Sequence, residues 1–162
     1  MQFAAAMLLL MDAFAWAYRG YPGVVGYYMV RISNFLVFLC VAFVLTASYL
    51  DWGGSKVLAE LESNGALKFT FQYLYYLFET ALFLLIIVYG QKAFEKWIHR
   101  ENIPYGGIVV ALTWGMAHWL TKGSLSAGLF SAVSGFCFGV VYLLLNRNIK
   151  WTYVVLCIMF IL

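Results

Sequence analysis

Residues 69–88 read FTFQYLYYLFETALFLLIIV, and this stretch decides the class of fold. It is predominantly apolar, and its single carboxylate, Glu79, lies about ten residues in. A helix of about 20 residues crosses the ~30 Å hydrocarbon core of a bilayer. The stretch therefore predicts a membrane-spanning helix with an ionisable group near its middle.

The composition of the whole chain agrees with this interpretation. Apolar residues make up 65% of the 162 residues and charged residues 10%, against about 45–50% and 25% in soluble domains. No soluble fold of this length has enough interior to hide that much apolar surface. No segment alternates like an outer-membrane strand, so we expect an all-α, polytopic membrane bundle. The net charge of +3 gives no indication of nucleic-acid binding, and we expect none.

Charged and turn residues divide the chain into six apolar segments, which predicts about six transmembrane helices in a single domain, 1–162. Residues 1–68 would hold two N-terminal helices and a polar connection, and 69–162 a four-helix core. An amphipathic extension over 90–100 is expected to lie along the membrane surface. The expected spans are roughly 1–18, 24–50, 69–88, 105–120, 124–145 and 151–162.

The distribution of Lys and Arg orients these spans, because cytoplasmic loops carry an excess of both. Seven lie on the face of the first, third and fifth connections and three on the opposite face. We therefore expect a multi-pass cell-membrane protein with the 90–103 and 146–150 connections in the cytoplasm and both termini outside.

Four polar residues inside the expected spans are candidates for function: Glu79, His118, Asp12 and Asn34. An ionisable group within a membrane helix is a functional candidate by default. Glu79 as a neutral acid is able to donate a proton, and His118, between two tryptophans, is able to orient a water. Each also has a structural interpretation, as a side chain whose hydrogen bonds fix two helices together.

Depth disfavours a Glu79–His118 pair. Measured from the turn at Pro104, His118 lies ~21 Å along its helix and Glu79 ~37 Å along a straight preceding helix. One Glu and one His do not make a zinc site, which takes three protein ligands in catalysis. No cysteine has metal-ligand spacing, and no nucleophile or nucleotide motif occurs. We expect no metal and no cofactor.

Small residues recur at four-residue intervals in the fifth expected span, at Ser131, Gly135 and Gly139. Such spacing lets two membrane helices approach closely, so we expect this face to pack against another helix or a partner protein.

A family resemblance covers residues 79–162. It is carried by Tyr89-Gly90 leading into the amphipathic extension, by Trp114-Gly-Met-Ala-His118, and by the glycine-spaced helix that ends at Tyr142. In these features the chain resembles the CPBP family of polytopic intramembrane glutamate proteases, also called CAAX or Abi-type proteases. The resemblance implies a membrane helical core and, in active members, proteolysis.

The chain departs from that family at its catalytic motifs. The family's Glu-Glu-xxx-Arg would fall on Leu84, Leu85 and Tyr89, and its closing His-xxx-Asn on about Cys157 and Ile161. We therefore expect a non-catalytic membrane scaffold that contacts lipid and another membrane protein or a second copy of itself. Its expected contact surfaces are the small-residue face of 124–145 and the 91–100 extension. A divergent protease using Glu79 and His118, and a small transporter or channel lined by Asp12, Asn34 and Glu79, stay open as alternatives.

Overall fold

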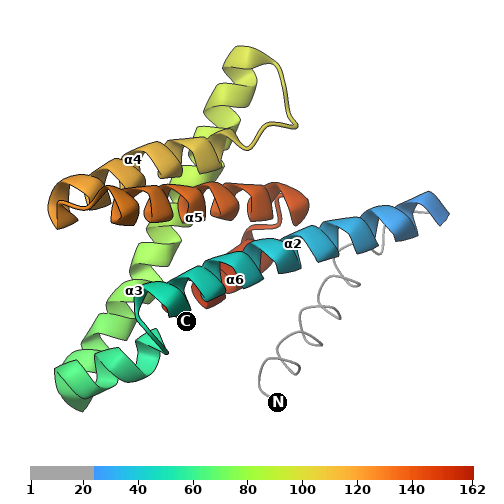
Figure 1. Cartoon of the computed structure of the whole chain (residues 1–162). Coiled ribbons are helices and arrows are strands. Elements are labelled where there is room, and N and C mark those ends of the chain that lie inside the picture. The colour runs from blue at the N-terminus through green and yellow to red at the C-terminus, as the bar shows by residue number, and fades with distance from the viewer. Residues whose placement is uncertain (1–23) are drawn as a thin grey trace.

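The computed structural model describes the backbone of residues 24–162 and the side chains of residues 32–162, and this part of the chain is helical without any strand. The expected all-helical fold is confirmed there, while Asp12 and the expected 1–18 span lie outside the described residues. In Figure 1, α4 and α5 run side by side across α3, and α2 lies near α6. The helices are α2 (Val24–Asp51), α3 (Lys56–Ile98), α4 (Tyr105–Lys122), α5 (Leu125–Leu144) and α6 (Ile149–Ile161).

Three of these helices are long and apolar enough to cross a membrane: α2 over Ile32–Asp51, α3 and α5. The expectation of six spans is wrong for the described residues. The 18 residues of α4 are enough in length, but His118, Lys122 and the glycines lower its hydropathy. The 13 residues of α6 cover only ~20 Å at 1.5 Å per residue.

A sharp turn at Gly65 divides α3 into two helical segments, 56–64 and 66–98. Gly65 has φ 70° and ψ 164°, which is not helical. In a straight helix residues 60 and 76 would lie ~24 Å apart, yet the Tyr76 hydroxyl donates a hydrogen bond of 2.7 Å to Glu60. The segment 56–64 therefore folds back on the beginning of 66–98. Residues 56–64 of the expected polar connection therefore form a helix that packs against the rest of α3.

The far end of α3 also differs from the expectation. The helix continues through Gly90 to Ile98 without a break, so no bend separates the expected extension over 90–100 from the rest of α3. His99 ends it in the left-handed conformation, with its N–H bonded to the Glu95 carbonyl at 2.8 Å. Figure 1 shows this end of α3 projecting past α4.

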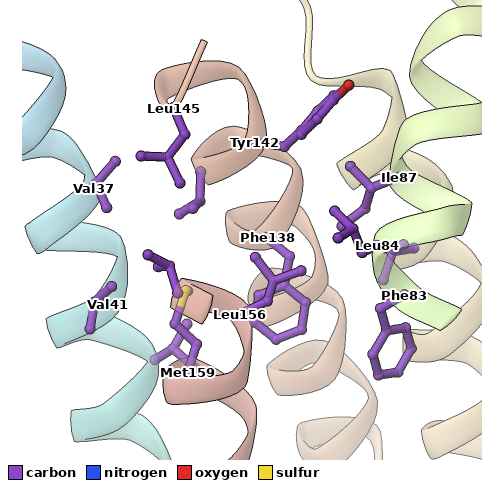
Figure 2. Close-up of a cluster of buried hydrophobic side chains, with 14 of the residues drawn as sticks. Val37, Val41, Phe83, Leu84, Ile87, Phe138, Tyr142, Leu145, Leu156 and Met159 are labelled. Atoms are coloured by element: carbon purple, nitrogen blue, oxygen red, sulfur yellow. The ribbon is translucent and has the colours of Figure 1, made fainter. Parts of the chain in front are cut away.

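The apolar core lies where α2, α3, α5 and α6 meet (Figure 2). From α2 it takes a narrow stripe of three valines one helical turn apart, Val37, Val41 and Val44, while most other large side chains of this helix are exposed. From α3 it takes Phe83, Leu84, Ile87 and Val88, spaced as one helical face. Leu156 and Met159 of α6 belong to it, together with Phe138 and Tyr142 of α5 and with Leu145, which follows α5.

Close backbone packing joins α4 to α5 and to α3. A Cβ on Gly139 would collide with the backbone of Gly107, and a Cβ on Gly106 would collide with the Ile87 carbonyl. At the other end of the pair, a Cβ on Gly128 would lie 2.6 Å from the Trp119 Cβ. Glycine is therefore required where these helices cross, because any side chain would push the backbones apart.

Candidate functional site

Glu79 and His118 are held separately. The Nδ1–H of His118 donates to the Trp114 carbonyl one turn earlier, at 3.2 Å, and its ring packs edge-on against the Trp114 indole. Glu79 is half-buried in α3, and its negative charge attracts the Lys56 ammonium. Within residues 32–162, no hydrogen bond or ion pair joins the two side chains. The described residues therefore do not form an acid–base pair from them.

Their separation has a different origin from the depth difference expected from the sequence. The loop 99–104 folds back along α3, so that α4 begins beside the end of α3 and not beyond it. The Tyr105 ring stacks on Phe94 with centroids 5.7 Å apart, and Gly106 packs against Ile87. The rings of Phe83 and Trp114 then meet with centroids 4.8 Å apart. Phe83 lies one turn after Glu79 in α3, and Trp114 one turn before His118 in α4. Glu79 and His118 engage different partners.

The positions that correspond to the family's first motif point in different directions. Leu84 is buried in the core, whereas the side chains of Leu85 and Tyr89 are 50% and 69% exposed on the outer face of α3. They converge neither with one another nor with His118 on a common site.

The other residues singled out from the sequence lie within helices or at helix–helix contacts. Asn34 of α2 is half-buried, and its Oδ1 has no hydrogen-bond partner. Ser131 is buried in α5. A Cβ on Gly135 would lie 2.8 Å from Val110 of α4, and Gly139 touches Gly107. The small-residue face of α5 is therefore covered by α4 and is not free to receive a partner.

The most concentrated polar site in the described residues was not anticipated. It lies inside the fold at Gly65 and is called here the hairpin cluster: Lys56, Glu60, Asn64, Gln72, Tyr73 and Tyr76. Oε1 of Glu60 accepts hydrogen bonds from the Tyr76 hydroxyl at 2.7 Å and from Nε2 of Gln72 at 2.9 Å. Nδ2 of Asn64 donates to Oε1 of Gln72 at 2.7 Å. Glu60 is only 3% exposed, so a carboxyl group is held inside the protein by neutral donors.

Lys56 connects the hairpin cluster to α6. Its ammonium donates to the Phe160 carbonyl at 2.9 Å and lies over the rings of Tyr76 and Phe160, 4.6 and 5.1 Å from their centroids. A cation near the end of a helix stabilises the carbonyls that have no partner within it. Lys56 therefore caps α6 and holds the folded-back segment against it.

The sequence contains a weak signal for this cluster. Lys56 and Glu60 are one helical turn apart, and so are Gln72 and Tyr76, on either side of Gly65. The pattern fits two short helical faces that meet across a glycine turn. The signal is weak because charges, glycines and an asparagine in one run are also typical of a polar connection.

A second polar cluster fixes the opposite end of the molecule. Gln91 is 1% exposed; its Nε2 donates to the Ile103 carbonyl at 2.8 Å and its Oε1 accepts from the Gly106 N–H at 3.0 Å. Arg147 forms an ion pair of 2.7 Å with Glu95. These contacts tie the loop 99–104 and the α5–α6 turn to the end of α3, which is a structural role.

The described residues contain no group of three or more His, Cys, Asp or Glu side chains arranged to hold a metal ion. The comparisons found no match for this chain among family models, curated proteins or solved structures.

Proposed function

We propose that this chain is a non-catalytic integral membrane protein that acts as a scaffold or partner subunit for another membrane protein or a second copy of itself. The observation that carries the non-catalytic part is the separate engagement of Glu79 and His118, together with apolar side chains at Leu84 and Leu85. A glutamate protease needs an acid and a base that share a water, and these positions offer none.

The partner surface that fits this role is the outer stripe of α3. It consists of Phe71, Tyr75, Phe78, Leu82, Leu85 and Tyr89, whose side chains are 50–69% exposed. They alternate at intervals of four and three residues, the spacing of the seam in a left-handed helix pair. A straight partner helix is able to follow this seam for about five turns. The small-residue face of α5 is unable to serve as the partner surface, because α4 covers it. The outer stripe takes that role in this proposal.

Site-specific photo-crosslinking in the native membrane tests this proposal. A photoreactive residue at Phe78, in the middle of the outer stripe, should give one protein adduct of defined mass. The matched control is Leu129 of α5, whose 59% exposed side chain should give lipid adducts only. Lipid adducts alone at both positions would show that the outer stripe faces lipid and would overturn the scaffold.

The non-catalytic part has its own test. The purified protein should not cleave a membrane-embedded reporter peptide. Cleavage that disappears in both Glu79→Gln and His118→Ala would replace the scaffold with a divergent protease. Cleavage unchanged in both variants would indicate a contaminating protease and would leave the proposal standing.

We also propose that the 90–103 and 146–150 connections face the cytoplasm. The ion pair between Arg147 and Glu95 brings both connections to one end of the molecule, where Lys92, Lys96, Arg100 and Lys150 add positive charge. At the other end, the positive charges of Lys56 and Lys122 are close enough to repel each other. Labelling of a cysteine introduced at Lys96 by a membrane-impermeant reagent should require disruption of the cell membrane, and labelling in intact cells would reverse the orientation.

A further inference from the structure

Two of the three cysteines lie far apart along the chain and meet inside the molecule. Cys40 belongs to α2 and Cys137 to α5, and their thiol groups form a side-chain hydrogen bond. Both side chains are partly buried and pack against the apolar core, next in sequence to Val41 and Phe138. A thiol is a weak donor and a weak acceptor, so this bond adds little to the attachment of α2. The contact does place two oxidisable sulfur atoms side by side.

The third cysteine has different surroundings. The thiol of Cys157 in α6 bonds to the side chains of Tyr153 and Thr80. The neighbours of this thiol are therefore hydroxyl groups, which form no covalent bond with sulfur in thiol chemistry. The same fold thus holds a pair of thiols and a third thiol that serves as a reference for it.

A covalent bond between the paired thiols would join two helices that are held in unequal ways. α2 gives the core a narrow stripe of valines, and most of its other large side chains are exposed. α5 is fixed by backbone contact with α4, as at Gly139. Two thiols in hydrogen-bond contact need only a small further approach to reach the ~2.05 Å of an S–S bond. A bond between residues so far apart in sequence also restricts the unfolded chain and so favours the folded one.

We propose that Cys40 and Cys137 are a redox pair that closes to a disulfide between α2 and α5 when an apolar disulfide compound oxidises them. The two cysteines lie inside apolar segments that are able to cross a membrane, Ile32–Asp51 and Leu125–Leu144. An oxidant that reaches them must therefore dissolve in the membrane interior, which excludes charged disulfides. This inference goes beyond the scaffold role and does not depend on it.

The reaction is a thiol–disulfide exchange in two steps. In the first step one cysteine loses its proton, its sulfur attacks a sulfur of the oxidant, and the S–S bond of the oxidant breaks. The half that leaves takes up the proton and becomes a free thiol. In the second step the other cysteine sulfur attacks the sulfur of the first, and the second half leaves as a thiol with the second proton. Two electrons pass from the cysteine sulfurs to the oxidant.

Reaction of the purified full-length protein with dithiodipyridine, an apolar aromatic disulfide, tests the proposal. In Cys157→Ser, which keeps the pair alone, each chain should release two thiopyridone molecules, retain no pyridyl group and show a peptide link between residues 40 and 137. The wild-type chain should show the same link. The matched variants Cys40→Ser and Cys137→Ser should each keep a pyridyl group on the remaining member of the pair.

Three results would overturn the redox pair. They are a pyridyl group retained on each of the two cysteines, a disulfide between two separate chains, and no reaction of either thiol in the folded protein. The charged disulfide of glutathione supplies a further control, because it should leave the pair open when the protein is embedded in liposomes. Closure at an equal rate by both disulfides would contradict access through the membrane interior.

The unfolding temperature measures what the bond does to the fold. It should be several degrees higher in the oxidised wild-type protein than in the reduced one, and a reducing agent should reverse the change. Cys40→Ser and Cys137→Ser should show no such difference between oxidising and reducing conditions. An equal or lower unfolding temperature in the oxidised wild-type protein would show that the bond strains the contact between α2 and α5, and it would count against the proposal.

Discussion

Two glycines hold two regions of the molecule in shape for different reasons. Gly139, at the α4–α5 interface, has a helical backbone, and a Cβ there would collide with the backbone of Gly107. Gly65, in the α3 hairpin, has no atom within 4 Å of the position of a Cβ, but its φ of 70° and ψ of 164° are accessible to almost no other residue. The first region depends on the space between two helices, and the second on one backbone torsion.

The difference extends to the side chains around each glycine. Where α4 packs against α5, backbone and small side chains touch, so the interface has little room to adjust. Around Gly65, hydrogen bonds between side chains hold the fold-back together. We therefore expect α4–α5 to open only when the whole protein unfolds and the hairpin to open locally.

The largest effect should come from Gly139→Ala. The added methyl group meets backbone atoms that are unable to yield without separating the helices, and we expect a loss of about 3 kcal/mol in the free energy of unfolding. Chemical denaturation in detergent, followed by circular dichroism, measures it. Gly90→Ala is the control, because its Cβ would lie 3.4 Å from Val109, and alanine there should change stability by about 1 kcal/mol or less. Similar values for both variants would contradict a sterically closed interface.

Gly65→Ala should have a smaller and more local effect. We expect a cost of about 1–2 kcal/mol from the strained backbone, confined to the hairpin. Hydrogen exchange should rise in 56–64 and stay unchanged in α4 and α5. Glu62→Gln, a change at an exposed residue of the same segment, should leave exchange as it is. A uniform rise across all helices would show that the hairpin and the α4–α5 interface unfold together. It would contradict local opening of the hairpin.

The sequence predicts these two regions unequally. Ser131, Gly135 and Gly139 stand out because small residues four apart are regular enough to be visible in a single helix. Gly65 does not, because one glycine among polar residues is typical of a loop, and only the partners across the turn, such as Glu60 and Tyr76, reveal a folded hairpin. The apolar helices follow from composition. The pairing of groups far apart along the chain, such as Lys56 with Phe160, does not.

Tyr76→Phe should weaken the hairpin by removing one interaction. The Tyr76 hydroxyl donates to Glu60 and contacts Nε2 of Gln72 at 2.6 Å. Its loss should cost about 1 kcal/mol, with increased exchange in 56–64 as the readout. Tyr75→Phe, on the outer stripe, is the matched control, since its side chain is 60% exposed and its hydroxyl makes none of the hydrogen bonds described for the hairpin. Equal effects from both variants would argue against the hydrogen-bonded fold-back.

The smallest effect is expected for Arg147→Ala at the opposite end. Arg147 is 39% exposed and Glu95 12%, so solvent screens the ion pair, and Gln91 still donates to Glu95 when the arginine is gone. We expect a loss below about 1 kcal/mol that shrinks as salt is added. A loss that persists unchanged at high salt would show that Arg147 contributes through packing and not through charge.

The bond from Lys56 to the Phe160 carbonyl spans 104 residues, and this has a consequence for biosynthesis. At a translation rate of about 5–20 residues per second, the Lys56 ammonium waits roughly 5–20 s before its acceptor has been made. During that interval the first turn of α3 has no α6 to cap and its charge remains without a place inside the protein. The segment 56–64 is therefore expected to dock last, after the remaining helices have entered the membrane.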